Sequence, residues 1–151
     1  WNKWKAADLE LSALTTQNMM MAEQLNQVNN ELGDIKNDLA ILISPEFSRI
    51  ILNGTDNAPT AKAVVYWNQR LEKVFLHTKF MAALPQDQQY QLWAIIDGQP
   101  VDAGTFDGNT DSFVEMKNIA KADAFAVTIE KSGGSATPTL STMQVIGNIS
   151  S

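Results

Sequence analysis

The residues that could carry out chemistry are few in this sequence and lie far apart. The one histidine, His77, falls in a predicted strand in which it shares a face with Lys73 and Lys79, so we expect it at the surface or at a sheet edge. A general base needs an orienting partner and a nucleophile beside it, and the sequence has no Gly-x-Ser-x-Gly pattern to supply a nucleophile. The sequence therefore predicts no catalytic residue and no enzyme.

Oxygen-bearing side chains alternate at Asp107, Asn109 and Asp111, as they do at the start of a calcium-binding loop. The pattern then fails, because Ser112 stands where such a loop needs glycine and Asn118 stands where it needs a bidentate glutamate. We expect a hairpin turn with solvated carboxylates here. Whether the three side chains bind a cation stays open.

The composition excludes further classes of function. The 151 residues include no cysteine, which excludes disulfides, thiolate zinc sites, iron–sulfur clusters and cysteine nucleophiles. The formal net charge is −6, so no basic surface is available to neutralise phosphates, and we expect no nucleic-acid partner. We also expect no metal and no other cofactor. Apolar residues make up 44% of the chain, which is enough to build a hydrophobic core.

The chain begins with Trp1-Asn2-Lys3-Trp4-Lys5 and lacks both the apolar run and the small-residue cleavage site of a signal peptide. Because it starts with tryptophan rather than methionine, we expect it to be a fragment of a longer protein. Tryptophan and lysine are typical of the segment just outside a membrane span. An alternative is that Trp4 begins an amphipathic helix, with Trp1 as its exposed end, and both interpretations stay open.

Apolar residues follow a 3-4 spacing from Trp4 to Leu42 and predict one long helix. Five heptads carry a single polar interruption, and Ser44-Pro45 ends the helix because the residue before proline is pushed out of the α region. From the second heptad onward, the a and d positions are occupied by residues that we expect to mediate oligomerisation: Leu11, Leu14, Asn18, Met21, Leu25, Val28, Leu32, Ile35, Leu39 and Leu42.

We expect this helix to self-associate. It would be roughly 60 Å long at 1.5 Å per residue, whereas a globule of the remaining residues would be roughly 35 Å across, so much of the apolar stripe would overhang into water. Asn18 at an a position favours two parallel strands, and Glu31 at g would attract Lys36 at the following e position of the other chain. Leucine at a with Ile35 at d favours higher oligomers, so a dimer is favoured while the number of strands stays open.

After Ile43 the apolar period changes to two and predicts seven or eight short strands. Turn residues such as Asp97-Gly98 and Gly133-Gly134 separate them, and one helical turn is allowed over 117–123. The expected strands cover 47–52, 61–67, 73–84, 90–96, 100–106, 113–116, 124–130 and 143–149. The prediction is a mainly β fold, an antiparallel β-sandwich preceded by a long coiled-coil helix.

The predicted domains are a helical coiled-coil stalk over 1–43 and a β-sandwich over 44–151. Within the strand 124–130, Phe125, Val127 and Ile129 share one parity and are expected on the core side. The alternate residues, from Ala124 to Glu130, are expected on the opposite face, which would make a sheet with one face in the core.

Two stretches of the second half form longer motifs. The first runs over 90–106 and reads YQLWAIIDGQPVDAGTF, and the second runs over 125–135, reads FAVTIEKSGGS and is followed by Pro138-Thr139. Together they resemble the C-terminal, extracytoplasmic domain of the anti-sigma-K factor (RskA-like) family, over residues 47–149 and without the helix. The motif residues are Tyr90, Leu92, Trp93, Asp97, Gly98, Pro100, Gly104, Phe106, Phe125, Val127, Glu130, Gly133 and Gly134.

These motif residues have expected roles that are structural. Asp97-Gly98 supplies the positive φ of a tight hairpin turn, and Gly104 marks a bulge or a close backbone approach. Tyr90, Leu92, Trp93 and Phe106 supply large apolar area to a fold without disulfides.

The resemblance implies a membrane-anchored anti-sigma factor that controls an extracytoplasmic-function sigma factor, and hence transcription, through signal-dependent proteolysis. It places this chain on the extracytoplasmic (periplasmic) face of the bacterial inner membrane, tethered by a transmembrane helix upstream of residue 1. The sigma factor would be bound by a cytoplasmic segment that this chain does not contain, and envelope proteases would be further partners. The alternative is an exported coiled-coil and β-sandwich module of the cell envelope that binds a ligand or a partner.

Overall fold

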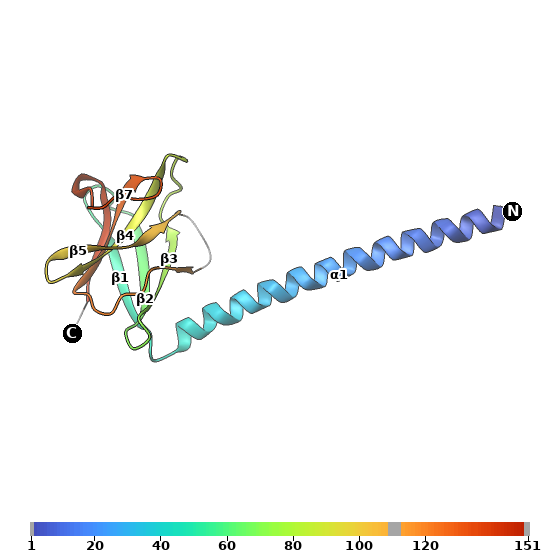
Figure 1. Cartoon of the computed structure of the whole chain (residues 1–151), viewed down its shortest axis with the longest axis horizontal. Helices are drawn as coiled ribbons and strands as arrows, with labels where there is room; N and C mark the ends of the chain where they lie inside the picture. Colours follow the sequence, from blue (N-terminus) through green and yellow to red (C-terminus); the bar gives the residue numbers. More distant parts are fainter. Residues whose placement is uncertain (1, 109–112, 150–151) are drawn as a thin grey trace. The chain divides into compact units, whose positions relative to one another are not determined.

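The computed structural model describes residues 2–108 and 113–149 (Figure 1). The chain divides into two compact units, Trp1–Ala40 and Ile41–Ser151. We call the first the helical unit and the second the sheet unit, and each is described by itself.

Helix α1 spans Asn2–Ile43 without interruption and ends directly before Ser44-Pro45, as the sequence predicts. The apolar side chains at its a and d positions are not buried. From Leu11 to Leu42 their exposed fractions lie between 49%, at Leu32, and 65%, at Leu11. Among the described residues, no helix is both long enough and apolar enough to cross a membrane.

In the described part of the sheet unit, eight strands form one antiparallel sheet with the order β5-β4-β7-β8-β1-β2-β3-β6. A mainly β fold with a long helix before it confirms the predicted fold class. The strands are β1 (Ser48–Gly54), β2 (Lys62–Asn68), β3 (Lys73–Phe80), β4 (Gln88–Ile96), β5 (Gln99–Phe106), β6 (Val114–Glu115), β7 (Ala124–Lys131) and β8 (Met143–Asn148).

The sheet curls until its two edges approach each other, which gives the unit a barrel-like form. Directly after β6, the backbone N–H of Lys117 donates to the carbonyl oxygen of Ala103 in β5, with an N–O distance of 2.9 Å. The ammonium group of Lys117 also pairs with the carboxylate of Asp102 in β5. Gly104 permits this approach, because a Cβ at its position would lie 3.0 Å from Cε of Met116.

One hydrophobic core fills the inside of the curled sheet. It takes side chains from seven of the described strands and from the loops, and its fully buried members include Leu52, Val65, Val74, Leu76, Leu92, Phe125, Val127 and Val145. The inward parity of Phe125 and Val127 is the predicted one.

The outward face of β7 is buried as well, which corrects the prediction of a sheet with only one face covered. Ala126, Thr128 and Glu130 are almost completely buried, although they point away from the core. Their cover comes from the segment between Gly133 and Met143, which carries a 3-10 turn at Leu140–Thr142 and is hydrogen-bonded to β7.

The helical turn considered for 117–123 is absent from the described structure. The backbone N–H groups of this segment bond to distant parts of the chain instead: Ile119 donates to Glu72 and Asp123 donates to Ile95. A helical turn over 117–123 would need the N–H of Asp123 to bond to the carbonyl oxygen of Ile119 instead, so tertiary pairing decides the conformation.

A second, smaller apolar cluster lies on the outward face of β2 and β3. Ile41, from the last turn of α1, is buried there with Val64 and Tyr66. The ring of Tyr66 meets Phe113 edge to face, with centroids 5.1 Å apart. His77 is half-buried beside the same Phe113 ring at 5.4 Å, at the margin of this cluster.

Candidate functional site

The two motif stretches lie side by side in the sheet. The first forms β4 and β5, the second forms β7 and the turn after it, and β4 pairs with both neighbours. At the tip of the β4–β5 hairpin, Asp97 and Gly98 have φ values of 52° and 79°, the backbone of a tight two-residue turn.

The carboxamide of Gln91 joins the two motifs from inside β4. Its Nε2 donates to Oδ1 of Asp102 at 2.9 Å and to the carbonyl oxygen of Ser135 at 3.0 Å. Its Oε1 accepts from the N–H of Ser135 at 2.8 Å. Gln91 is buried, so these bonds satisfy polar atoms that water does not reach.

Gly134 is the residue that lets the second motif come this close. Its φ is 88°, and a Cβ at its position would lie 2.9 Å from both Oε1 of Gln91 and Cγ2 of Thr105. The turn after β7 therefore tolerates no side chain at Gly134 while Gln91 holds the backbone of Ser135.

A chain of hydrogen bonds crosses the outward faces of β4 and β7. Nε1 of Trp93 donates to Oγ1 of Thr128 at 2.9 Å, and this hydroxyl donates to Oε2 of Glu130 at 2.5 Å. Glu130 then holds Thr139, accepting from its N–H at 2.8 Å and from its hydroxyl at 2.7 Å. The Glu130 carboxylate thus binds the segment between Gly133 and Met143, which we call the covering segment, to β7.

Two carboxylates of this region, the buried Glu130 and the half-buried Asp102, keep their charge through hydrogen bonding. Burial acts to raise the pKa of Glu130, but bonds from Thr128 and Thr139 outweigh it and hold the pKa below its ordinary value. Burial likewise opposes the charge of Asp102, and bonds from Lys117, Gly104 and Gln91 lower its pKa overall.

An apolar pocket of about 380 Å³ lies on the outward face of β4 and β7, next to this chain of bonds. Trp93, Ala126 and Thr128 line its floor, and Pro100, Pro138 and Leu140 are among the residues of its walls. No charged side chain lines it, and the Thr128 hydroxyl already has a donor and an acceptor. The pocket could hold an uncharged apolar group and offers no group for acid–base chemistry.

The described residues contain no group of three or more side chains placed to hold a metal ion. Of the three candidate cation ligands, Asn109 and Asp111 lie outside the described residues. The carboxylate of Asp107 is described, and its Oδ1 lies 3.5 Å from Nε2 of Gln89.

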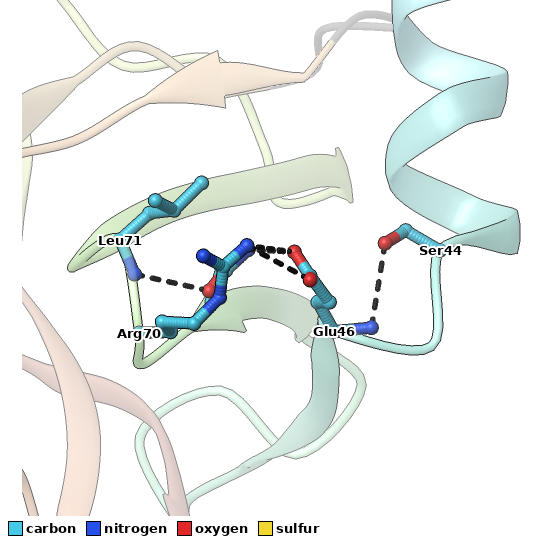
Figure 2. A network of polar contacts seen from close by, with 5 residues as sticks. Ser44, Glu46, Arg70 and Leu71 are labelled. Atoms are coloured by element: carbon cyan, nitrogen blue, oxygen red, sulfur yellow. Dashed lines mark hydrogen bonds and ion pairs between the residues drawn. The ribbon is translucent and has the colours of Figure 1, made fainter.

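The chain enters the sheet unit through a polar network after α1, drawn in Figure 2. Nη2 of Arg70 lies 2.8 Å from both carboxylate oxygens of Glu46, and the N–H of Glu46 donates to Oγ of Ser44. Nδ2 of Asn68 also donates to Glu46, and its Oδ1 accepts from the N–H of Leu71. Hydrogen bonds from Arg70 and Asn68 lower the pKa of Glu46.

The predicted site residues thus fall into two sets. The motif residues are brought together in β4, β5, β7 and the following turn, whereas the a and d residues of the helix line one exposed stripe. Sequence reasoning missed the linking roles of Gln91, Thr128 and Thr139. Gln91 lies inside the first motif, and a polar residue amid its apolar neighbours was the available signal.

The comparison with protein families gives one match. A family model described as "Anti-sigma-K factor rskA, C-terminal" matches residues 6–145. The chain belongs to this family. The RskA family consists of regulatory, membrane-associated anti-sigma factors, which act on a sigma factor. Comparison with curated proteins and with solved structures gives no match.

The RskA match begins inside α1, so the expectation that the resemblance leaves out the helix is wrong. A heptad pattern is shared by many unrelated helices, and for that reason the helix offered no residue by which to recognise the family. The helix and the sheet belong to one family region.

Proposed function

We propose that this chain is the extracytoplasmic region of a membrane-anchored anti-sigma factor of the RskA family. In this proposal the sheet unit stands in the periplasm, and a cytoplasmic segment elsewhere in the parent protein holds an extracytoplasmic-function sigma factor. Signal-dependent proteolysis outside the membrane then leads to release of the sigma factor. The observation that carries the proposal is the family match, which spans nearly the whole chain.

The structure supports a regulatory rather than a chemical role for the sheet unit. Its buried polar groups, Gln91 and Glu130 above all, bind other parts of the same unit. Such a role requires envelope proteases as partners. The segment around Ser44-Pro45 and Glu46 joins the sheet unit to α1.

The location is tested with enzyme fusions to the parent protein, joined directly after Ile149 of the present chain. Alkaline phosphatase needs disulfides and is active only outside the cytoplasm, whereas β-galactosidase is active only inside. We expect an active phosphatase fusion and an inactive galactosidase fusion. The reverse pair of results would contradict the periplasmic location.

The regulatory role is tested with a transcription reporter for the sigma factor that co-purifies with the parent protein. Removal of the sheet unit from the parent protein should mimic the proteolytic signal and raise reporter transcription several-fold. Deletion of the whole parent gene gives the upper reference. Transcription that stays the same in both strains would contradict the anti-sigma role.

A second candidate is an exported envelope module that binds a ligand, and the apolar pocket favours it. Octyl glucoside below its micellar concentration is a suitable probe, since it joins an uncharged sugar to an aliphatic chain. This candidate expects saturable binding that Leu140→Asp, on the pocket wall, abolishes without lowering stability. Absence of binding to the wild-type chain would contradict it.

A further inference from the structure

We propose that α1 pairs with α1 of a second copy of this chain, in a parallel, two-stranded coiled coil from Trp4 to Leu42. The starting observation is an apolar stripe without a partner. From Leu11 to Leu42 every apolar a and d side chain of α1 is about half exposed or more. A helix of this length draws its stability from packing an apolar face rather than from local propensity, so the stripe requires a partner.

The last turn of α1 shows that its own sheet does not cover the stripe there. Ile41, at a c position, is 9% exposed and packs with Val64 and Tyr66. The next residue, Leu42 at a d position, is 51% exposed. Ile41, which contacts the sheet, and Leu42, at the d position, therefore lie on different faces of the same turn. The stripe of a and d residues, which we call the seam, is thus uncovered as far as Leu42.

The single polar core residue favours a parallel arrangement of two identical chains. In a parallel pair, Asn18 meets Asn18 of the second copy, and each amide gains a partner. A fully overlapped antiparallel pair would instead place Asn18 against Val28. Two buried amides would then lack partners, at a cost in free energy that the parallel pair avoids.

The charges beside the seam favour the same orientation. In a parallel pair, Glu31 at g faces Lys36 at the following e position of the second copy. In an antiparallel pair g positions face one another, and the same overlap brings Glu10 near Asp38 of the second copy. The parallel dimer thus gains an attraction between opposite charges, whereas the antiparallel dimer brings like charges at g positions together.

Sedimentation of the full chain tests the association. We expect a dimer at micromolar concentration. Leu25→Asp should raise the dissociation constant by about a thousandfold, because each chain loses a core leucine and gains a buried charge. Asn30→Asp is the matched control: it adds the same charge at an f position of the same helix, and its dissociation constant should stay near that of the wild type.

Trp1 and Trp4 are replaced by phenylalanine in both variants and in the reference chain, so that Trp67 and Trp93, both buried in the sheet unit, are the fluorophores. Their fluorescence should be the same in the two variants and shows that this unit remains folded. A monomeric wild-type chain would overturn the proposal. Three or more chains in the wild-type assembly would overturn its two-stranded form.

Disulfide trapping tests the orientation, and the chain has no cysteine of its own to interfere. In a parallel dimer Leu14→Cys lies against itself at a d layer, and the dimer should become covalent in a glutathione redox buffer. An antiparallel dimer would place Leu14 against Leu32, so only a mixture of Leu14→Cys and Leu32→Cys would crosslink efficiently. Asn30→Cys, at an f position, should stay uncrosslinked. Crosslinking confined to the mixture would overturn the parallel orientation.

Discussion

Glu130 is a charged side chain in a place where an unpaired charge would be costly. It is almost fully buried, and Thr128 and Thr139 satisfy its two oxygens. Hydrogen bonds to a charged group contribute more than those between neutral groups. The residue therefore links the stability of β7 to the position of the covering segment.

Replacing Glu130 with glutamine should lower the free energy of unfolding by about 2 kcal/mol, because the amide is neutral and one of its ends can no longer accept from Thr139. Urea unfolding followed by tryptophan fluorescence measures the change. Lys131→Gln, at the exposed neighbouring position, is the control and should alter stability by less than about 0.5 kcal/mol. Equal stability of the two variants would contradict this role for Glu130.

The same carboxylate predicts how stability depends on pH. Glu130 and Asp102 both have folded-state pKa values below their ordinary values. The unfolded chain therefore binds more protons than the folded chain in acid, and stability falls as the pH drops. We expect nearly constant stability between about pH 7 and pH 5, and a decline from about pH 4.5, where unfolded carboxylates titrate. Urea midpoints measured across this range should fall less steeply for Glu130→Gln than for the wild type.

At the scale of elements, two glycines illustrate opposite constraints. Gly134 has a positive φ and no room for a Cβ, whereas Gly33 lies in α1 with nothing within 4 Å of a Cβ. Gly134→Ala should destabilise the sheet unit by about 2 kcal/mol, and Gly33→Ala should stabilise the helix by about 1 kcal/mol. Thermal unfolding followed by circular dichroism measures both, and a gain of stability in Gly134→Ala would contradict the tight approach to Gln91.

Asn18 gives a prediction about α1 as an element. Asn18→Leu should stabilise the assembly and loosen its stoichiometry, because a buried amide specifies two strands at a cost in stability. Sedimentation equilibrium should then detect mixed species that the wild type does not form. An unchanged stability would indicate that Asn18 is not buried in the assembly.

The sequence predicted the elements better than their arrangement. Turn residues such as Asp97-Gly98 and helix-ending Ser44-Pro45 act locally, so strand and helix limits differ from the structure by few residues for most elements. β3 is the exception: it ends at Phe80 because Met81 turns back to bond Thr78. The segment between Gly133 and Met143 covers β7 because Glu130 binds Thr139. These two residues meet only after folding, so no local sequence pattern predicts the contact.

The candidate site divides in the same way. Resemblance located the motif strands, whereas the joining roles of Gln91 and Thr128 depend on which strands become neighbours. Strand order is set by long-range pairing. The alternation of apolar residues indicates which side chains share a face, but it does not predict which strands are neighbours. The curl of the sheet into one nearly closed layer has the same origin.

At the scale of the whole molecule, each core cluster is built from residues between Ile41 and Ile149. A shortened chain of residues 41–149 should therefore fold and unfold at the urea midpoint of the full chain, and sediment as a monomer. A chain of residues 44–149 lacks Ile41 and should lose about 1–2 kcal/mol, since Val64 and Tyr66 lose a buried apolar contact. Failure of the 41–149 chain to fold would contradict a self-sufficient sheet unit.

The meeting of the two sheet edges has a consequence wherever many copies of this domain lie close together. An open edge strand displays unpaired N–H and C=O groups on which another chain can add a strand. Here the bond from Lys117 to Ala103 and the ion pair with Asp102 occupy part of the β5 edge, and β6 offers only Val114–Glu115. Many copies of this domain can therefore be held close together with little risk that their strands join into aggregates.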